Sequence, residues 1–213
     1  ELRKGPNIAT LPDVGPLPDT LELPVVLKMG DDISTDEILR AGAEVLPFRS
    51  NIPEIAKFAF DVVDPTYHDR AVEAREAGAG HAVVGGSNYG QGSSREHAAL
   101  APRYLGLRVA IAREFARIHA QNLANFGVVP LQFVDEDDWD RIEQGDVLRL
   151  TGLRDALRAG EEVVVDNTTQ GTSLTVRHIL SPAQVERVLE GGVIRFMKQR
   201  LDNADVDASD RPV

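Results

Sequence analysis

The chain has 213 residues, which is enough for one domain that buries about 70% of its unfolded surface. Its 34 acidic and 23 basic residues give a net charge of -11 at pH 7, which argues against nucleic acid or an anionic membrane as a partner. An anionic substrate would therefore need a local cluster of basic residues. The chain has no cysteine, so disulfides, thiolate chemistry and cysteine-held metal clusters are excluded for it.

The start of the sequence does not indicate a membrane or secretory segment. No apolar run approaches the roughly 18 to 20 residues of a transmembrane helix, and residues 1–22 are polar and proline-rich, unlike a signal peptide. We therefore expect a soluble, cytoplasmic protein without a membrane partner. The sequence begins at Glu1 rather than at methionine, which suggests a fragment or processed product of a longer chain.

The first part of the chain predicts a linker followed by short elements. Residues 1–23 carry four prolines and no sustained periodicity, which is typical of an extended linker. The apolar run 24–28 predicts a strand. Segment 33–40 then predicts a short helix with one of three consecutive polar residues as its cap, namely Ser34, Thr35 or Asp36.

The next segments predict a loop, two helices and a buried strand. The loop over 44–51 carries Arg49, and an isolated loop arginine is usually solvated. Helices are predicted at 53–60, where proline stands in the first turn, and at 66–77, where charged residues cover one face. Apolar residues 81–84 predict a short strand that leads into a glycine-rich turn.

The glycine-rich turn joins that strand to a predicted helix at 96–105. Ser93 and Glu96 have the spacing of a capping box. The helix would then hold Ser93, Ser94 and Arg95 in its first turn, where backbone N–H groups lack intrahelical partners and attract anions. Arg95 can fork onto a carboxylate or phosphate, and a serine hydroxyl in that field could be held as an alkoxide. We therefore predict an anion site here.

The rest of the sequence alternates strands and helices. Helix 114–126 contains His119 and Asn122, which we expect to form an internally hydrogen-bonded structural pair. The polar, acidic end of the chain predicts a flexible tail over 202–213. The alternation predicts an α/β domain over residues 24–201 with some parallel pairing. The other predicted elements are strands at 108–112, 128–133, 147–150, 162–165 and 173–179, a hairpin turn at 167–171, and helices at 135–144, 181–190 and 193–201.

These residues suit one kind of chemistry. The sequence shows no convincingly spaced serine–histidine–acid triad and no histidine or carboxylate cluster with metal-ligand spacing. It offers one anion-binding turn, one candidate alkoxide and two candidate clamping arginines, Arg49 and Arg95. Such a set fits a polycarboxylate substrate and abstraction of a proton next to a carboxylate.

The run Tyr-Gly-Gln-Gly-Ser-Ser-Arg-Glu-His at 89–97 resembles the signature of the C-terminal swivel domain of aconitases of the mitochondrial and bacterial A type. The isopropylmalate isomerase small subunit shares the Gly-Ser-Ser-Arg-Glu-His core, so that core identifies only the superfamily. The resemblance covers the chain from residue 4 to about residue 201. Three flanking features favour aconitase: residues 4–8, residues 34–36 with 48–51, and residues 115–119 with 122–123.

The resemblance implies a fold and a role for each candidate residue. The fold would be a swivelling three-layer β/β/α domain. Ser93 would be the base that removes the carbon-bound proton of citrate or isocitrate, and Ser94 and Arg95 would bind a substrate carboxylate. Arg49 would bind another carboxylate, and Asp36 would support the site by hydrogen bonding.

The resemblance also implies a cofactor and partners. The complete aconitate hydratase of the tricarboxylic acid cycle would carry a 4Fe-4S cluster on other domains, with none bound by this chain. The expected partners are that cluster-bearing catalytic body and the substrates citrate, isocitrate and cis-aconitate, so this chain alone should be inactive. Two alternatives stay open: the small subunit of 3-isopropylmalate isomerase in leucine biosynthesis, and a non-catalytic carboxylate-binding module.

Overall fold

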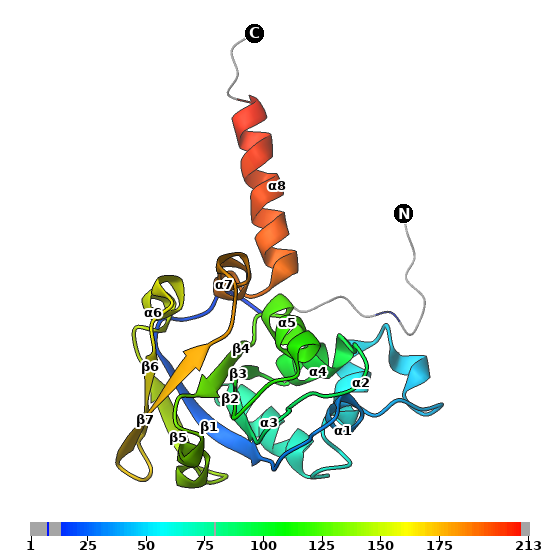
Figure 1. Ribbon diagram of the computed structural model, residues 1–213. Coiled ribbons are helices and arrows are strands. Elements are labelled where there is room, and N and C mark those ends of the chain that lie inside the picture. The colour runs from blue at the N-terminus through cyan, green and yellow to red at the C-terminus, as the bar shows by residue number, and fades with distance from the viewer. Residues whose placement is uncertain (1–7, 9–13, 79, 210–213) are drawn as a thin grey trace.

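The computed structural model describes residues 8, 14–78 and 80–209 of the chain. Within these residues seven β-strands form one closed barrel, with helices on one side of it and at one end (Figure 1). Neighbouring strands from β1 to β4 run parallel, and the other pairs, including β1 with β5, run antiparallel. In their order around the barrel the strands are β1 (Leu21–Lys28), β2 (His81–Gly85), β3 (Leu107–Ala112), β4 (Val129–Phe133), β7 (Thr172–His178), β6 (Val163–Asn167) and β5 (Val147–Leu150).

Helical segments make each crossover between parallel strands, because two parallel neighbours cannot be joined by a tight turn. Helices α1 to α3 connect β1 with β2, α4 connects β2 with β3, and α5 connects β3 with β4. The α-helices in the described residues are α1 (Thr35–Ile38), α2 (Ile52–Ile55), α3 (Tyr67–Glu76), α4 (His97–Tyr104), α5 (Arg117–Asn125), α6 (Leu153–Ala159), α7 (Pro182–Leu189) and α8 (Val193–Ser209). The 3-10 helices are η1 (Leu46–Phe48), η2 (Ala56–Phe58) and η3 (Glu136–Arg141).

The parallel strands separate two apolar cores. Successive side chains of a strand point to opposite faces, so Val109 and Ile111 of β3 fill the barrel interior, while Ala110 and Ala112 pack beneath the helices. All residues of β2 are buried for the same reason. This double burial explains why the parallel strands read as continuous apolar runs in the sequence.

The predicted α/β class is confirmed, and the two β layers are opposite walls of the barrel with the helices as the third layer. Strand β1 begins three residues earlier than predicted, because Leu21 and Leu23 pair with β5 and fill the barrel interior. Residues 21–23 of the predicted linker therefore lie in the sheet. Most of that linker, residues 1–7 and 9–13, lies outside the described residues.

Several helices differ from their predictions. The predicted helix 53–60 is two short pieces, α2 and η2. Helix α6 was not predicted; it follows Gly152, which has a φ of +64° and no side chain to cap the helix. Helix α8 continues to Ser209, so the predicted tail is helical up to that residue, and residues 210–213 lie outside the described part.

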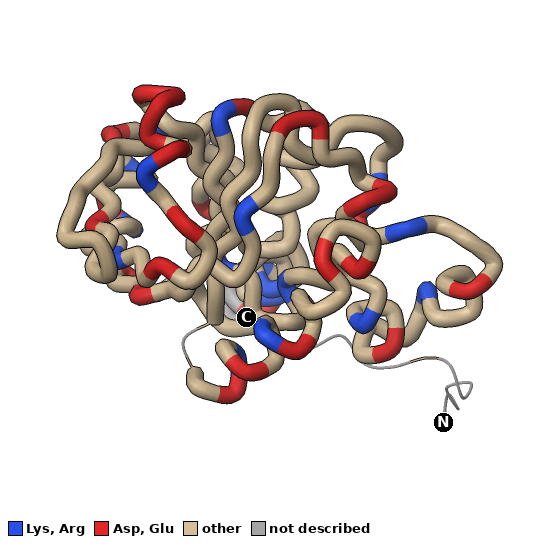
Figure 2. Tube along the Cα trace, turned by 90° about the horizontal axis from the view of Figure 1, so that it is seen from below, with Lys and Arg blue, Asp and Glu red and all other residues tan. Residues whose placement is uncertain are grey.

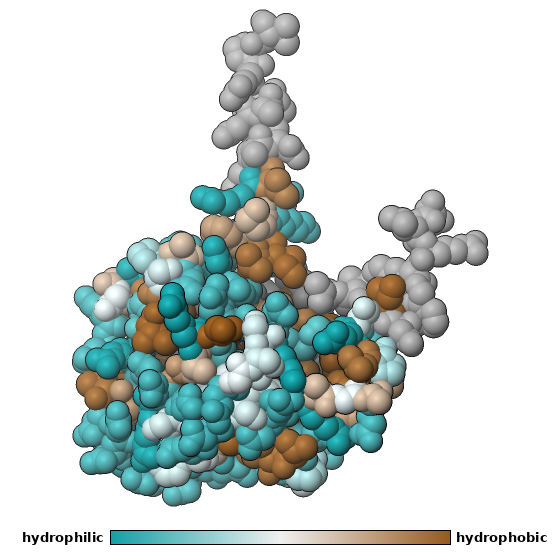
Figure 3. Space-filling model, turned by 45° about the vertical axis from the view of Figure 1, so that its right-hand side comes forward, coloured by the Kyte–Doolittle hydropathy of each residue, from teal (hydrophilic) through white to brown (hydrophobic). Residues whose placement is uncertain are grey.

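Helix α8 extends away from the barrel (Figure 1). It carries three exposed apolar side chains, Ile194, Met197 and Leu201. The space-filling view shows apolar surface where this helix leaves the body (Figure 3). None of the helices in the described ranges is long and apolar enough to cross a membrane.

Candidate functional site

The glycine-rich turn after β2 lies between two neighbouring loops at one end of the barrel. Because β1, β2 and β3 are parallel neighbours, the loops that leave their carboxyl ends meet at the same edge. The loop after β1 contacts the turn through the N–H of Asp32, which donates to the carbonyl of Ser87 at 2.8 Å. The loop after β3 contacts its other side, where Tyr89 donates to Glu114 and accepts from Ala116, each at 2.9 Å.

Polar side chains hold the shape of the turn. Asn88 has a φ of +56°, a left-handed conformation that asparagine tolerates better than most residues. Its side-chain amide donates to Asp32 Oδ1 at 2.9 Å and to Gln91 Oε1 at 3.2 Å. Gln91 in turn donates from Nε2 to the carbonyl of Asp32 at 2.7 Å. These contacts join the turn to the loop after β1 by side chain as well as by backbone.

Gly90 is required by close packing. Its φ is +82°, and a Cβ atom at this position would lie 2.3 Å from the ring of His119. The same ring packs edge-on against Tyr89, with ring centroids 5.3 Å apart, and Tyr89 packs edge-on against Phe115 at 5.6 Å. The turn therefore packs on a buried aromatic cluster of Tyr89, Phe115 and His119, on the α5 side of the sheet.

The predicted hydrogen-bonded pair of His119 and Asn122 is wrong. Both residues are buried, but within the described part of the chain neither ring nitrogen of His119, nor the side-chain nitrogen of Asn122, has a hydrogen-bond partner. Burial lowers the pKa of His119 to about 4, so the ring is neutral near pH 7. His119 supports the turn by packing rather than by hydrogen bonding.

The predicted capping box at Ser93 and Glu96 is also wrong. Helix α4 begins at His97, with Glu96 as its N-cap and no side-chain capping bond. Ser93 is instead joined to α1, because its carbonyl accepts a hydrogen bond from Thr35 Oγ1 at 3.1 Å. Ser93 and Ser94 therefore lie in an exposed bend before the helix, where no acceptor among the described residues takes their backbone N–H groups.

Arg95 is fixed by two contacts on one side of its guanidinium. Its Nη1 lies 2.5 Å from Asp36 Oδ1 and donates to the carbonyl of Leu39 at 3.0 Å. Asp36 is not the cap of α1; that role belongs to Ser34, which forms a capping box with Glu37. The Asp36 carboxylate is thus available to orient Arg95, and it does so from an exposed position.

Arg49 lies beside Arg95. Its carbonyl accepts a hydrogen bond from His97 Nε2 at 2.9 Å, which places a hydrogen on that nitrogen and joins η1 to the start of α4. Arg49, Arg95 and His97 line a small pocket of about 50 Å³. Arg40, which the sequence did not single out, lines it too and pairs with Asp61 at 2.9 Å.

The structure brings Arg49, Arg95 and Asp36 together, and it leaves Ser93 and Ser94 outside the pocket lining. Arg49 and Arg95 line one pocket, Asp36 pairs with Arg95, and the two serines directly precede Arg95 in the chain. Guanidinium groups and unpartnered backbone N–H groups together can bind the carboxylates of a small anion. The exposed serine hydroxyls can exchange a proton with a ligand held there.

The residues of this chain do not fit a 4Fe-4S cluster. The chain has no cysteine, and the described residues contain no group of three or more histidine, aspartate or glutamate side chains that could hold a metal ion. Any such cluster would need ligands from elsewhere.

A family model described as the aconitase C-terminal domain matches residues 54–136. A putative mitochondrial aconitate hydratase of Emericella nidulans is 36% identical over 218 residues, which cover 91% of this chain and 27% of that protein. The chain thus spans about a quarter of the length of this relative.

Two further matches come from the isopropylmalate dehydratases. A protein named 3-isopropylmalate dehydratase small subunit 2, of Archaeoglobus fulgidus, is 36% identical over 82% of this chain and 93% of its own length. A crystal structure of 3-isopropylmalate dehydratase from Methanocaldococcus jannaschii superposes with a TM-score of 0.71, at 24% identity, over 88% of this chain and 99% of that one. The structural likeness shows a shared fold, and the named relatives are hydro-lyases.

Proposed function

This chain belongs to the aconitase C-terminal domain family, and on that premise we propose that it supplies one half of an aconitate hydratase active site. It binds the carboxylates of citrate and isocitrate and takes up a proton at Ser93. The other half, with the 4Fe-4S cluster, belongs to a catalytic body on other polypeptide, since this chain has no residues that fit the cluster.

One observation carries the proposal: Arg95 is already oriented for a carboxylate. Asp36 and the carbonyl of Leu39 hold its Nη1, and a guanidinium has further N–H groups that these two acceptors leave for a ligand. Arg49 lines the same pocket, so two carboxylates of one substrate can each meet an arginine.

Proton transfer in this proposal takes place at Ser93 Oγ. The substrate's carbon–hydrogen bond breaks, its proton goes to Oγ, and the electron pair is spread into the adjacent carboxylate. A serine hydroxyl holds its proton strongly, so the base form needs a positive field. Arg95 and the N–H groups of Ser93 and Ser94, for which the described residues offer no acceptor, would supply that field. Departure of the substrate hydroxyl belongs to the catalytic body.

The chain alone should show no conversion of isocitrate to cis-aconitate, and mixing it with a cluster-bearing aconitase body that lacks its own C-terminal domain should restore turnover. The reason is that, in this proposal, the acid–base and carboxylate-binding groups are on this chain, whereas the cluster and the groups that release the substrate hydroxyl are on the catalytic body. The ultraviolet absorbance of its carbon–carbon double bond follows cis-aconitate formation. Turnover by the isolated chain would contradict the half-site proposal, and failure of every mixture would favour a non-catalytic carboxylate-binding module.

In the same mixture, citrate and isocitrate should be used in preference to isopropylmalate. The flanking sequence features that favour aconitase motivate this preference, because the two pocket arginines, Arg49 and Arg95, fit the two carboxylates of isopropylmalate as well. The competing candidate is the small subunit of 3-isopropylmalate isomerase, which is favoured by the relative that this chain covers over 93% of its length. The ratio of kcat/KM for the two substrates decides between them, and a higher value for isopropylmalate would favour the small-subunit function.

Replacing Arg95 with lysine should raise KM by about one to two orders of magnitude, because lysine keeps the charge but loses the planar fork. The pairing with Asp36 gives a matched control, since Asp36→Asn keeps the side chain's shape and removes only its charge. Asp36→Asn should raise KM less than Arg95→Lys does. Steady-state kinetics measure both, and an unchanged KM in a folded Arg95→Lys enzyme would exclude Arg95 as a carboxylate ligand.

The predicted cytoplasmic location is not tested by these experiments and stays a prediction.

A further inference from the structure

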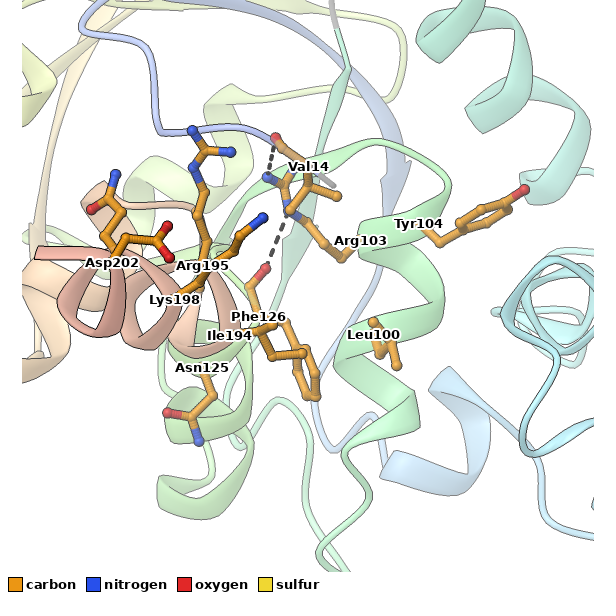
Figure 4. Close-up of a pocket in the computed structure, with 13 residues that line it drawn as sticks. Val14, Leu100, Arg103, Tyr104, Asn125, Phe126, Ile194, Arg195, Lys198 and Asp202 are labelled. Atoms are coloured by element: carbon orange, nitrogen blue, oxygen red, sulfur yellow. Dashed lines mark hydrogen bonds between the residues drawn. The ribbon is translucent and has the colours of Figure 1, made fainter. Parts of the chain in front are cut away.

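A second pocket lies at the base of α8, at the opposite end of α4 from the candidate site. Helix α4 begins at His97 in the candidate site and ends at Tyr104 in the second pocket, and a helix of eight residues is about 12 Å long. The second pocket has a volume of about 360 Å³ (Figure 4). We call it the α8 pocket, and its walls include Arg103, Tyr104, Phe126, Ile194, Arg195 and Lys198.

Arg103 is a buried cation in this wall. It is only 3% exposed, and its guanidinium donates to the carbonyls of Val14, Leu107 and Phe126, each at 3.2 Å. Among the residues that the structure describes, no carboxylate forms an ion pair with it. Burial and the neighbouring Arg108 guanidinium lower the pKa of Arg103 to about 9. An anion in the pocket would offset both the cost of burying the Arg103 charge and its repulsion by Arg108.

Two more cations face Arg103 from α8. Arg195 and Lys198 are three residues apart, so they share one face of the helix, and both reach toward Val14 and Arg103 (Figure 4). Acidic positions are distributed over much of the rest of the trace (Figure 2), in keeping with the net charge of -11. The α8 pocket is therefore a local positive region on an acidic protein, with Asp202 as an acidic residue in its lining.

The other wall of the pocket is apolar. Leu100, Phe126 and Ile194 line it, and Tyr104 contributes an aromatic ring. Ligand pockets of small organic molecules typically have volumes of about 300 to 1,000 Å³, mostly apolar walls and a few well-placed polar groups. The α8 pocket meets this description, whereas the 50 Å³ pocket at the candidate site is much smaller.

We propose that the α8 pocket binds a small organic anion in which a phosphate or carboxylate group adjoins an aromatic or aliphatic part. The anionic group contacts Arg103 and Lys198, and the apolar part lies against Phe126 and Ile194. This site is separate from the candidate site around Arg95, and it does not depend on the function proposed there.

Isothermal titration of the chain with three probes tests the proposal. Adenosine monophosphate carries a phosphate and an aromatic ring, 4-phenylbutyrate carries a carboxylate and an aromatic ring, and inorganic phosphate carries no apolar part. At least one organic anion should bind with a Kd below about 1 mM and at least about tenfold more tightly than inorganic phosphate. Which of the two binds identifies the anionic group. Equal binding of all three, or no binding of either organic anion, would overturn the proposal.

Lys198→Glu locates the bound probe, because Lys198 is exposed on α8 and its replacement leaves the core untouched. It should weaken binding by at least about tenfold, since one attraction becomes a repulsion. Arg177→Glu makes the same change of charge at an exposed position on β7 and should change Kd less than about twofold. Arg95→Lys should also leave this Kd unchanged. Equal losses in the Lys198 and Arg177 variants, or loss of binding in Arg95→Lys, would show that the probe does not bind in the α8 pocket.

Discussion

Replacing Ser93 with alanine should lower kcat of the complete enzyme by at least about a hundredfold and leave KM within a few-fold. The reason is that, in the proposed mechanism, the hydroxyl takes the proton in the transition state, whereas Arg49 and Arg95 bind the substrate carboxylates. Because Ser93 is not a helix cap, the loss of its hydroxyl removes no capping hydrogen bond. Ser93 is exposed and contacts α1 through its carbonyl, which alanine retains. The free energy of unfolding of the variant should therefore differ from that of the original protein by no more than about 0.5 kcal/mol.

Two controls accompany the Ser93 variant. Ser173→Ala removes a serine hydroxyl from β7, where it donates to Asp166, and should leave both kinetic constants unchanged. Ser94→Ala should raise KM more than it lowers kcat if Ser94 binds a substrate carboxylate. A folded Ser93→Ala enzyme with nearly the original kcat would rule out Ser93 as the base.

Gly90→Ala should lower the stability of the domain strongly. Alanine at a φ of +82° costs about 1 to 2 kcal/mol, and the new methyl group would meet the buried ring of His119, which adds about 1 to 3 kcal/mol. A total of about 3 kcal/mol would lower Tm by roughly 6 to 12 °C for a domain of this size. Circular dichroism or calorimetry measures the shift.

Gly145→Ala is the matched control for Gly90. Its φ is +97°, but no atom lies within 4 Å of an added Cβ, so only the backbone cost applies. The difference between the two variants therefore measures the packing of the turn on His119. If both variants lost the same stability, the aromatic cluster would contribute nothing to the position of the turn.

Two identical sequence patterns show how far the site could be predicted. Ser34 and Glu37 form a capping box, whereas Ser93 and Glu96, with the same spacing, do not. The pattern describes local chain preference, but at Ser93 a hydrogen bond from Thr35, about sixty residues earlier in the chain, takes the carbonyl and delays the helix to His97. Such a contact depends on the order of the strands, which the sequence does not show.

The strands, helix α6 and the site arginines differed in how well the sequence predicted them. The parallel strands were predictable because their faces are buried on both sides of the sheet and they read as apolar runs, but the closing pair of β1 and β5 joins distant segments. Helix α6 lacks a capping residue and was missed. Arg40 stands at the end of the predicted helix 33–40 and was not singled out there, and only the folded chain places it in the same pocket as Arg95. Arg95, Asp36 and Arg49 were predicted as site residues from their resemblance to family motifs, and the structure places them together.

The closing of the barrel determines how another polypeptide can bind. Since β1 pairs with β5, each described strand has a hydrogen-bonded neighbour on both sides along part of its length. Little strand edge is left for a partner that would attach by adding a strand to the sheet, the mode called β-augmentation. We expect a partner to contact side chains, loops or α8 instead, and such contacts can form and separate without opening the sheet. Binding and release of a catalytic body would then leave every hydrogen bond of the sheet intact.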